Sequence, residues 1–542
     1  MKTLFYYNQF QKRAQSLIFI IWKGLNIMEL IKEAVTVGEI LFSDSFEAAA
    51  DGDLIVPDIK PDILKVLQVD ATSCISSKEI SDGKLILGGR VNLTVLYLPD
   101  TEDGGVQSIK TTFEFSHKLD RPSIDESCSA IVDSDVSRVE FHVINSRKIS
   151  LRAAILIDCE IISAREIAFP IGIDDECAQV LTAPITVNAL CGVHDDEFMI
   201  KEGIEIPAGK ASIGEILKID YKLCDKEFKA ITEKLVVKGI LNVCILYTDT
   251  NGCIEHTEAD IPFTEVFDFP GITEDMTCEL NYRICDCYYD VAEDSDGDRR
   301  IVNIELLVCA EMKASEMREL EIISDCFLPG FETNITYSET EFNEITASPS
   351  CQNTLRDSAV TDKNQPQITG VYNVISRAVI TSSRTDENKL STEGKIEACI
   401  LYLSDSAQTP VYSFKKEIPF SYLLDSPGTE PGMSCCVAAD VSHTSFHLNA
   451  ANEVELRYIL NISASIPQRR TLSLIDDVET EEIPKNKKKG IVIYFVQPGD
   501  TLWSISKNYF IPPEQLAEFN QLNAKNPLNP GQQLIIPAQK SH

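Results

Sequence analysis

Residues 84–97 read KLILGGRVNLTVLY and set the architecture of most of this chain. Apolar and polar residues alternate from Val91 to Val95, which is the two-residue period of a half-buried strand. Two later segments have the same pattern: KLVVKGILNVCILY at residues 234–247 and KLSTEGKIEACILY at residues 389–402. In each, a glycine lies five residues and a tyrosine thirteen residues after the first lysine. The body of the chain is therefore one unit repeated three times.

The three copies also agree downstream of these segments. A phenylalanine is followed seven residues later by a proline in each copy: Phe115 and Pro122, Phe263 and Pro270, Phe420 and Pro427. An apolar run then closes each copy, at residues 151–162, 304–312 and 456–466. The first two copies share an entry segment, ILKV at residues 63–66 and ILKI at residues 216–219, which the third lacks in that form.

Turn-forming clusters at residues 100–105 and 248–252 separate the alternating runs, and helical periodicity is weak. Each copy is therefore predicted to be a mostly antiparallel β domain, either a sandwich or a partly open barrel. The spacing between copies, near 150 residues, is too long for a solenoid. The predicted fold class is mainly β, with three tandem antiparallel β domains followed by a small βααβ module.

Composition divides the chain into seven segments. A connector is predicted after the second repeat because that segment is rich in Ser, Thr, Asn and Asp and has little apolar period. The linker before the module ends in KNKKK at residues 485–489, and such a run is more often solvated than bound to an acidic partner or anionic lipid. The segments are an N-terminal segment at 1–45, repeat units at 46–182, 183–331 and 371–478, a connector at 332–370, a linker at 479–490 and the module at 491–538.

The N-terminal segment contains a short apolar run, residues 16–22, after Lys12-Arg13. This run is too short to span a bilayer and no small-residue cleavage site follows it, so no transmembrane segment is predicted. Met28 directly precedes ordinary polar sequence, and Lys23-Gly24 can be encoded by a purine-rich codon pair of the ribosome-binding type. The hypothesis is that translation starts at Met28, and native peptides from residues 1–27 would contradict it.

The last fifty residues follow a pattern of their own. A β-favouring run at residues 491–496 stops at Pro498-Gly499, a turn pair that cannot continue a strand. Asp500 or Thr501 can then cap a helix. The apolar residues of that helix fall on one face: Leu502, Ile505 and Tyr509.

A second helix follows the first. Pro512-Pro513 ends the first helix and opens the second, because proline is tolerated in a first turn and breaks a helix interior. Leu516 and Phe519 are predicted to form the inner face of this second helix. A loop then leads to a closing strand at residues 533–536, which gives the order β-α-α-β.

This module resembles a LysM domain over its whole length. The GDTLW opening at residues 499–503, Asn520 and Asn523, and the PGQQLIIP close at residues 530–537 match the family pattern at its usual spacing. In that family, a shallow groove between the first strand–helix loop and the loop before the last strand holds N-acetylglucosamine polymers such as peptidoglycan or chitin. The resemblance places eight residues in the groove: Gly499, Asp500, Thr501, Leu502, Asn526, Leu528, Asn529 and Pro530. LysM domains also bind proteins, so a glycan partner, a protein partner and a purely turn-shaping role for these residues stay open.

The composition is that of a folded and strongly acidic protein. Asp and Glu number 84 against 49 Lys and Arg, which argues against a nucleic-acid partner. Many of the 17 cysteines lie inside apolar strand-like runs, where a reduced thiol behaves as a small hydrophobe, as at Cys159, Cys244, Cys309 and Cys399. Together with the lack of a credible export signal, this pattern favours a reducing cytoplasm.

No catalytic constellation stands out in the sequence. There is no phosphate-binding loop and no H-E-x-x-H, and the seven histidines do not recur at equivalent repeat positions. Cys285-Asp286-Cys287 and Cys435-Cys436 lack a C-x-x-C register and are interpreted as buried or incidental thiols. Residues 294–298, DSDGD, place glycine too early for a calcium loop and are interpreted as an acidic hairpin turn. The prediction is a protein that is not an enzyme, with no catalytic residue, metal or cofactor.

Three β units of this kind followed by one LysM domain resemble the clostridial spore-coat morphogenetic proteins of the SpoIVA-interacting protein L type. The resemblance rests on the repeated Lys-Leu, Gly and Leu-Tyr positions, the Ile-Pro-Phe signatures at residues 261–263 and 418–420, and the terminal LysM domain, and it extends from about Leu41 onward. It implies a non-enzymatic scaffold in the cytoplasm of the mother cell, at the forespore surface, that helps the spore coat encase the forespore. Its LysM domain would dock to the coat-organising ATPase, stage IV sporulation protein A, with other coat proteins as further partners.

Two other functions stay open at this stage. One is a protein that binds peptidoglycan of the spore or cell wall through its LysM domain. The other is a wall hydrolase with a LysM targeting tail. No pair of carboxylates stands out at corresponding repeat positions, which weighs against the hydrolase.

Overall fold

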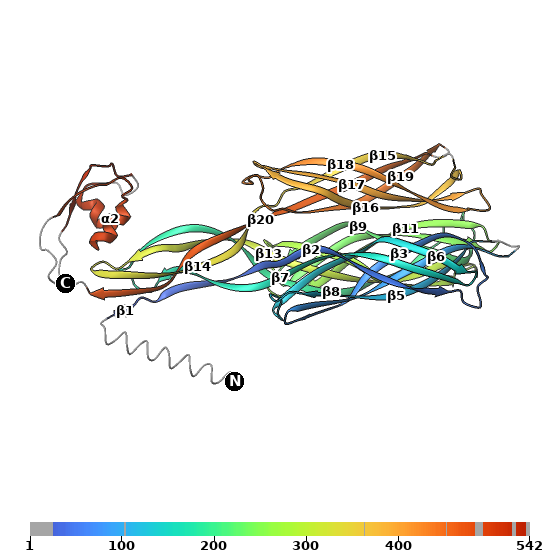
Figure 1. The fold of residues 1–542 in the computed structure, drawn as a ribbon, viewed down its shortest axis with the longest axis horizontal. Coiled ribbons are helices and arrows are strands. Elements are labelled where there is room, and N and C mark those ends of the chain that lie inside the picture. Colours follow the sequence, from blue (N-terminus) through green and yellow to red (C-terminus); the bar gives the residue numbers. More distant parts are fainter. Residues whose placement is uncertain are drawn as a thin grey trace, which may run out of the picture.

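The computed structural model describes residues 25–101, 105–362, 364–450, 453–482, 492–522 and 527–537. Over these residues the chain is almost entirely antiparallel β structure, with two short helices near its C-terminal end. Figure 1 shows β-sandwiches at one end, a narrow bundle of long strands in the middle and a small helical module at the other end. The fold class predicted from the sequence is confirmed.

The first repeat is a sandwich of two three-stranded layers. One layer is an antiparallel meander of β3 (Ile63–Ser81), β4 (Lys84–Pro99) and β5 (Gln107–Asp120). The other layer has the order β6-β7-β2, with β6 (Cys128–Asn145), β7 (Lys148–Ile173) and the second half of β2 (Leu30–Ile55). Alternate residues of β4, including Val91 and Val95, are fully buried between the layers, as the two-residue period predicts.

The second and third repeats have the same topology. In the second, the meander is β9 (Ile213–Ile231), β10 (Lys234–Asp249) and β11 (Ile254–Asp268). It packs on β12 (Thr277–Glu293), β13 (Arg299–Phe327) and β8 (Gln179–Glu205). In the third, the meander is β16 (Ile368–Asp386), β17 (Lys389–Ser404) and β18 (Val411–Asp425). It packs on β19 (Cys436–Ala450), β20 (Glu453–Glu482) and β15 (Ser350–Val360).

The glycine shared by the three repeats lies against a phenylalanine ring of the neighbouring strand. The directly opposed pairs are Gly89 and Phe115, Gly239 and Phe263, and Gly394 and Phe420. A Cβ atom on the glycine would lie 2.2 Å from the Phe115 ring, 2.8 Å from the Phe263 ring and 2.4 Å from the Phe420 ring. Glycine and phenylalanine therefore recur together because the ring occupies the space that any larger side chain would need.

The tyrosine shared by the three repeats is fully buried and makes the same hydrogen bond each time. Its hydroxyl donates to the backbone carbonyl of the residue 36 positions earlier. The pairs are Tyr97 with Pro61 at 3.0 Å, Tyr247 with Ala211 at 3.2 Å and Tyr402 with Pro366 at 3.0 Å. This recurring bond ties the end of the central strand to the segment that enters the meander, so the repeated motif has one structural role.

Substituting Gly394 with alanine is expected to lower the free energy of unfolding by about 1–3 kcal/mol, the usual cost of overpacking a core. Besides the Phe420 ring, the added Cβ would lie 2.5 Å from the Val379 backbone oxygen, which cannot rotate away. Chemical denaturation followed by circular dichroism measures the change. Gly370→Ala in the same repeat is the matched control, because a Cβ there meets nothing within 4 Å. Equal effects of the two substitutions would contradict the packing explanation.

Each repeat continues beyond its sandwich as a two-stranded ribbon, and the three ribbons together form the stalk. They pair residues 30–40 with 162–173, residues 179–190 with 315–327, and β14 (Phe331–Ala347) with residues 466–482. One apolar core joins all three ribbons, with Val35, Phe169, Ile185, Leu320, Phe342 and Leu474 among its members. The repeats are therefore packed together along the stalk as well as being consecutive in the chain.

The three sandwiches, called the heads below, meet around a shared apolar centre. Each head contributes three buried residues: Leu96, Leu98 and Val106 from the first, Leu217, Cys244 and Leu246 from the second, and Tyr372, Leu401 and Val411 from the third. The Tyr372 hydroxyl donates to the Cys244 carbonyl at 3.1 Å, which ties the third head to the second.

A buried ion pair lies beside this centre. Lys218 of the second head is 4% exposed, and its Nζ lies 2.6 Å from Oδ2 of Asp70 in the first head and 2.9 Å from Oδ1 of Asp220. Burial alone lowers the pKa of Lys218, but the Asp220 and Asp70 carboxylates outweigh it, so the pKa is raised. The lysine therefore stays charged inside the head junction.

The predicted connector at residues 332–370 is wrong, because most of these residues are strand. β14 and β15 run antiparallel to β20 and occupy the position that β2 has in the first repeat. The Ser-, Thr- and Asn-rich sequence of β14 is compatible with a strand whose residues are nearly all exposed or half-buried, since pairing with β20 satisfies its backbone.

The other predicted boundaries also cut through strands. The repeats extend over residues 30–173, 179–327 and 331–482, so β2 begins inside the predicted N-terminal segment and β8 crosses the boundary at residue 183. β20 extends to Glu482, inside the predicted linker, whose basic run at 485–489 lies outside the described residues. β1 (Leu25–Ile27) pairs with β20, and Met28 is buried at the stalk tip. The hypothesis of a start at Met28 stays a prediction.

Candidate functional site in the C-terminal module

The C-terminal module has the predicted order β-α-α-β. Its elements are β21 (Val492–Phe495), α2 (Leu502–Tyr509), α3 (Pro513–Phe519) and β22 (Gln533–Ile536). A small core of its own holds them together: Val496, Ile505, Ile511, Leu516, Leu534 and Ile536. Leu516 lies in this core as predicted, whereas Phe519 is 53% exposed and Ala517 takes the second inner position of α3. The prediction for Phe519 failed because α3 is short and ends at that residue.

The loop before α2 is fixed by its own polar side chains. Thr501 caps the helix: its side chain accepts a hydrogen bond from the Ser504 backbone N–H, and the Ser504 hydroxyl accepts one from the Thr501 N–H. The Asp500 carboxylate accepts from the Tyr494 hydroxyl at 2.6 Å and from the Gln497 N–H at 2.7 Å. The bond to Asp500 raises the pKa of Tyr494. Asp500 and Thr501 therefore shape the loop, whichever ligand it binds.

Asn520, one of the residues that carried the LysM resemblance, connects α3 to the closing strand. Its Oδ1 accepts from the Ile535 N–H at 2.6 Å, and its Nδ2 donates to the Ile535 carbonyl at 2.8 Å. This pair of bonds satisfies the exposed edge of β22. The signature asparagine is explained by the fold of the module.

The two loops predicted to form the groove lie side by side. Val496 N–H donates to the Gln532 carbonyl at 2.9 Å, and Gly531 N–H donates to the Val496 carbonyl at 2.8 Å. Of the predicted groove residues, four are exposed and three are half-buried; the exposed ones are Gly499, Thr501, Asn529 and Pro530, and the half-buried ones are Asp500, Leu502 and Leu528. Leu502 and Leu528 pack against the module core. The eighth, Asn526, lies outside the described residues.

The side of α2 that carries Trp503 and Lys507 packs against the stalk tip. The Trp503 indole N–H donates to Asp325 Oδ2 at 2.7 Å, and the Lys507 ammonium pairs with the same carboxylate. The Trp503 ring meets the Phe327 ring edge to face, with centroids 5.2 Å apart, and Gly330 N–H donates to the Phe510 carbonyl. The sequence did not reveal this contact, because it joins residues 178 positions apart and no local pattern connects them.

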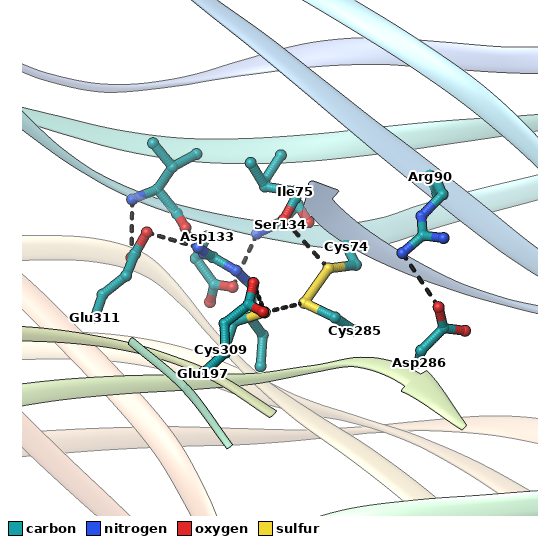
Figure 2. Close-up of a disulfide and its surroundings, with 12 residues drawn as sticks. Cys74, Ile75, Arg90, Asp133, Ser134, Glu197, Cys285, Asp286, Cys309 and Glu311 are labelled. Carbon is teal, nitrogen blue, oxygen red and sulfur yellow. Dashed lines mark hydrogen bonds and ion pairs between the residues drawn. A yellow bond between two sulfur atoms is a disulfide. The ribbon is translucent and has the colours of Figure 1, made fainter. Parts of the chain in front are cut away.

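Cys285, interpreted from the sequence as an incidental thiol, is joined to Cys74 in a disulfide (Figure 2). The bond links β3 of the first head to β12 of the second, and the Cys309 sulfur lies 2.6 Å from the Cys285 sulfur. Burial, with a contribution from the Glu197 carboxylate, raises the pKa of Cys309 to about 11. The interpretation of Cys285 was wrong because the facing of β3 and β12 is a tertiary contact with no signal in either strand.

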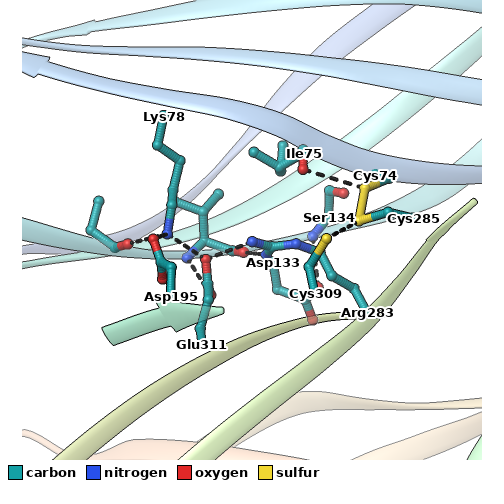
Figure 3. Close-up of polar contacts among 12 residues, drawn as sticks. Cys74, Ile75, Lys78, Asp133, Ser134, Asp195, Arg283, Cys285, Cys309 and Glu311 are labelled. Atoms are coloured by element: carbon teal, nitrogen blue, oxygen red, sulfur yellow. Dashed lines mark hydrogen bonds and ion pairs between the residues drawn. A yellow bond between two sulfur atoms is a disulfide. The ribbon is translucent and has the colours of Figure 1, made fainter. Parts of the chain in front are cut away.

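A buried carboxylate lies next to these sulfurs and also crosses the junction (Figure 3). Glu311 of the second head is 3% exposed. Its Oε1 lies 2.7 Å from the Nζ of Lys78 in the first head and 2.6 Å from the Nη2 of Arg283. Its Oε2 accepts from the Val132 N–H of the first head at 3.1 Å. The Arg283 guanidinium in turn donates to the Val132 carbonyl. The first two heads are therefore joined by a polar network as well as by sulfur.

The acidic segment at residues 294–298 forms the hairpin turn that the sequence indicated. The Asp294 carboxylate accepts from the Asp296 N–H at 2.9 Å and the Asp298 N–H at 3.0 Å, and Gly297 has a positive φ of 84°. These bonds give Asp294 a role in shaping the turn. In the part of the chain that the structure describes, neither helix has the length and apolar character needed to cross a membrane.

Comparison with known families matches both parts of the chain. The SipL, SPOCS domain matches three times, at residues 62–144, 212–292 and 367–449, and the LysM domain matches at residues 494–537. Each SPOCS match runs from the meander to the strand that follows it, so the long strands of the stalk lie mostly outside the matched ranges. No curated protein and no solved structure matches the chain. The domain set is that of a sporulation-associated protein with a module of the peptidoglycan-binding type. The chain belongs to the SipL type, with three SPOCS domains followed by one LysM domain.

Proposed function

We propose that this protein is a non-enzymatic scaffold of spore-coat assembly that attaches through its LysM domain to a coat-organising protein. The observation that carries the proposal is the seating of the module: α2 is fixed to the stalk through Trp503, while the loops with Thr501 and Asn529 are exposed. A module held in one orientation loses less entropy on binding than a freely tethered one. The proposed partner is a coat ATPase of the stage IV sporulation protein A type, at the forespore surface in the mother cell.

The heads support a role in assembly. They lie at the far end of the stalk from the module, and edge strands such as β6 carry exposed apolar residues, including Phe141 and Ile144. Edge strands can pair with other chains, so the heads are the proposed contact surface for other coat proteins. Several modest contacts on one chain raise effective concentration and favour cooperative encasement.

The alternative function is attachment to peptidoglycan through the same two loops. Half-buried Leu502 and Leu528 give these loops an apolar floor, and small neighbours such as Gly499 allow a sugar ring to approach. The glycan and the protein partner would use the same exposed edge, so one set of variants tests both.

Substituting Asn529 with arginine is expected to weaken binding to the true partner at least tenfold, about 1.4 kcal/mol, because a long charged side chain then fills the exposed edge. The full chain is incubated with purified stage IV sporulation protein A and, separately, with purified peptidoglycan, and the bound fraction is measured. Asp500→Asn is a poor probe, since Asp500 holds its own loop.

Gln515→Arg is the matched control, because Gln515 is exposed on α3 and belongs to neither loop. Both variants should keep the thermal unfolding of the parent. Binding to peptidoglycan alone would replace the scaffold proposal by the glycan alternative. Binding to the protein that Asn529→Arg leaves unchanged would exclude these loops as the contact surface.

A further inference from the structure

Three cysteine sulfurs converge at the junction of the first two heads. Cys74 comes from β3 of the first head, and Cys285 and Cys309 come from the neighbouring strands β12 and β13 of the second. The three sulfur atoms all lie within 4.8 Å of one another. The disulfide uses two of them, which leaves the Cys309 thiol against the bond without a role in it. The three sulfurs therefore form a cluster with one more sulfur than a disulfide needs.

Charged and polar side chains lie around the three sulfurs. Glu197 stands directly opposite Cys309 in the sheet, with its Oε1 3.7 Å from the Cys309 sulfur. On the other side of Cys309, Arg283 is its partner in β12. The Nε of Arg283 and the Oγ of Ser134 are buried and have no hydrogen-bond partner (Figure 3). Both are donors that a thiolate sulfur could satisfy.

We propose that the reduced cluster binds a thiophilic divalent cation, zinc being the best match, through the Cys74, Cys285 and Cys309 thiolates. Three thiolates with a fourth, oxygen ligand fit the tetrahedral preference of zinc, and Glu197 is placed to supply that oxygen. With zinc–sulfur bonds of about 2.3 Å, the sulfurs would separate to about 3.8 Å, which small side-chain rotations achieve. Arg283 offsets part of the negative charge of the ligands.

The disulfide form and the zinc-bound reduced form of the cluster would then both link the first head to the second. A dithiol opens the Cys74–Cys285 bond and becomes a cyclic disulfide, which leaves three thiols at the junction. Zinc displaces their three protons and rejoins the two heads. In a reducing compartment, where disulfides are opened, the metal would keep the first and second heads linked.

Cobalt(II) is the probe for this site. The full chain is reduced with dithiothreitol, desalted without oxygen and titrated with cobalt(II), then with zinc. We expect one cobalt per chain, a thiolate-to-cobalt charge-transfer band, and loss of that band when zinc is added. Metal should also protect Cys74, Cys285 and Cys309 from alkylation, as mapped by mass spectrometry. Absence of the band, or protection of a different set of cysteines, would overturn the proposal.

Matched variants locate the cation. Cys309→Ser, a nearly isosteric change, should lower cobalt affinity at least tenfold and weaken the charge-transfer band, because only the Cys74 and Cys285 thiolates remain. Cys436→Ser is the control, because Cys436 is exposed, lies beside Cys435 and is absent from the cluster. Glu197→Gln tests the fourth ligand without removing a thiol and should lower affinity while keeping the band. A band of full strength in Cys309→Ser would also overturn the proposal.

Discussion

Replacing Lys218 with methionine is expected to lower the free energy of unfolding by about 3–5 kcal/mol, the usual cost of removing one partner of a buried ion pair. The substitution leaves Asp70 and Asp220, with side chains 25% and 15% exposed, facing each other without a cation. Hydrogen exchange measured by mass spectrometry should show loss of protection in β3 and β9, the strands that carry the three residues. Chemical denaturation gives the free energy.

The pH dependence of this contribution has a definite sign. Because the pKa of Lys218 is raised above its usual value, the folded chain keeps the proton more firmly than the unfolded chain. The stabilisation is therefore complete at neutral pH and is lost as the pH rises beyond the ordinary lysine value of about 10.4 towards the folded one. The methionine variant should lack this alkaline loss.

Lys201 provides the control for Lys218. It pairs with Glu305 at 3.0 Å, but the side chains are 57% and 46% exposed, so Lys201→Met should change the free energy of unfolding by about 0.5 kcal/mol or less. Adding Asp70→Asn and Asp220→Asn to Lys218→Met should recover part of the loss, because the unpaired charges are then gone. Similar small effects of Lys218→Met and Lys201→Met would show that the ion pair does not hold the heads together.

Replacing Glu311 with leucine should cost about 3 kcal/mol, because Arg283 and the Val132 N–H then lose their shared acceptor inside the junction. Lys78 keeps Asp195 at 2.7 Å, which limits the loss. The expected signature is local: faster hydrogen exchange in β6 and β12 at the first head junction, with β17 of the third head unchanged.

Glu305→Gln is the control for Glu311, since Glu305 lies in the same strand and its side chain is 46% exposed. It should change stability by about 0.5 kcal/mol or less. The experiment is run with the Cys74–Cys285 bond both intact and reduced, because the bond crosses the same junction. Uniform loss of protection over all three heads would indicate that Glu311 acts on the fold as a whole and not on this junction.

The repeat and the module could be predicted because their signals are local. A glycine that must lie under a ring, as Gly89 does under Phe115, and a buried tyrosine such as Tyr97 recur at fixed spacing because each head needs the same contacts. The LysM signature is equally local, since Thr501 and Asn520 shape turns and edges within a few dozen residues.

The stalk and the junctions could not be predicted, for two physical reasons. All but one of the β14 residues are exposed or half-buried, and the strand is held by backbone pairing with β20, which leaves little apolar period in the sequence. Lys218 and Glu311 lie in strands where a charge normally marks the solvent face, and only tertiary contacts bury them. Hydrogen bonds of Val496 with Gln532 and Gly531 bring the two predicted groove loops side by side, and the groove itself stays a prediction. Asp500 fixes its own loop, and the contact of Trp503 with Asp325 joins residues far apart in sequence.

The long strands of the stalk have a mechanical consequence. β13 has 29 residues, and at about 3.3 Å per residue it extends for roughly 95 Å, from a head to the tip where the LysM domain sits. A pull between the LysM domain and the heads acts along these strands, whereas the hydrogen bonds of an antiparallel ladder lie across them. Tension therefore shears many bonds at once instead of unzipping them one by one. A protein built in this way would transmit load from whatever its LysM domain holds to whatever its heads hold, with little extension of its own.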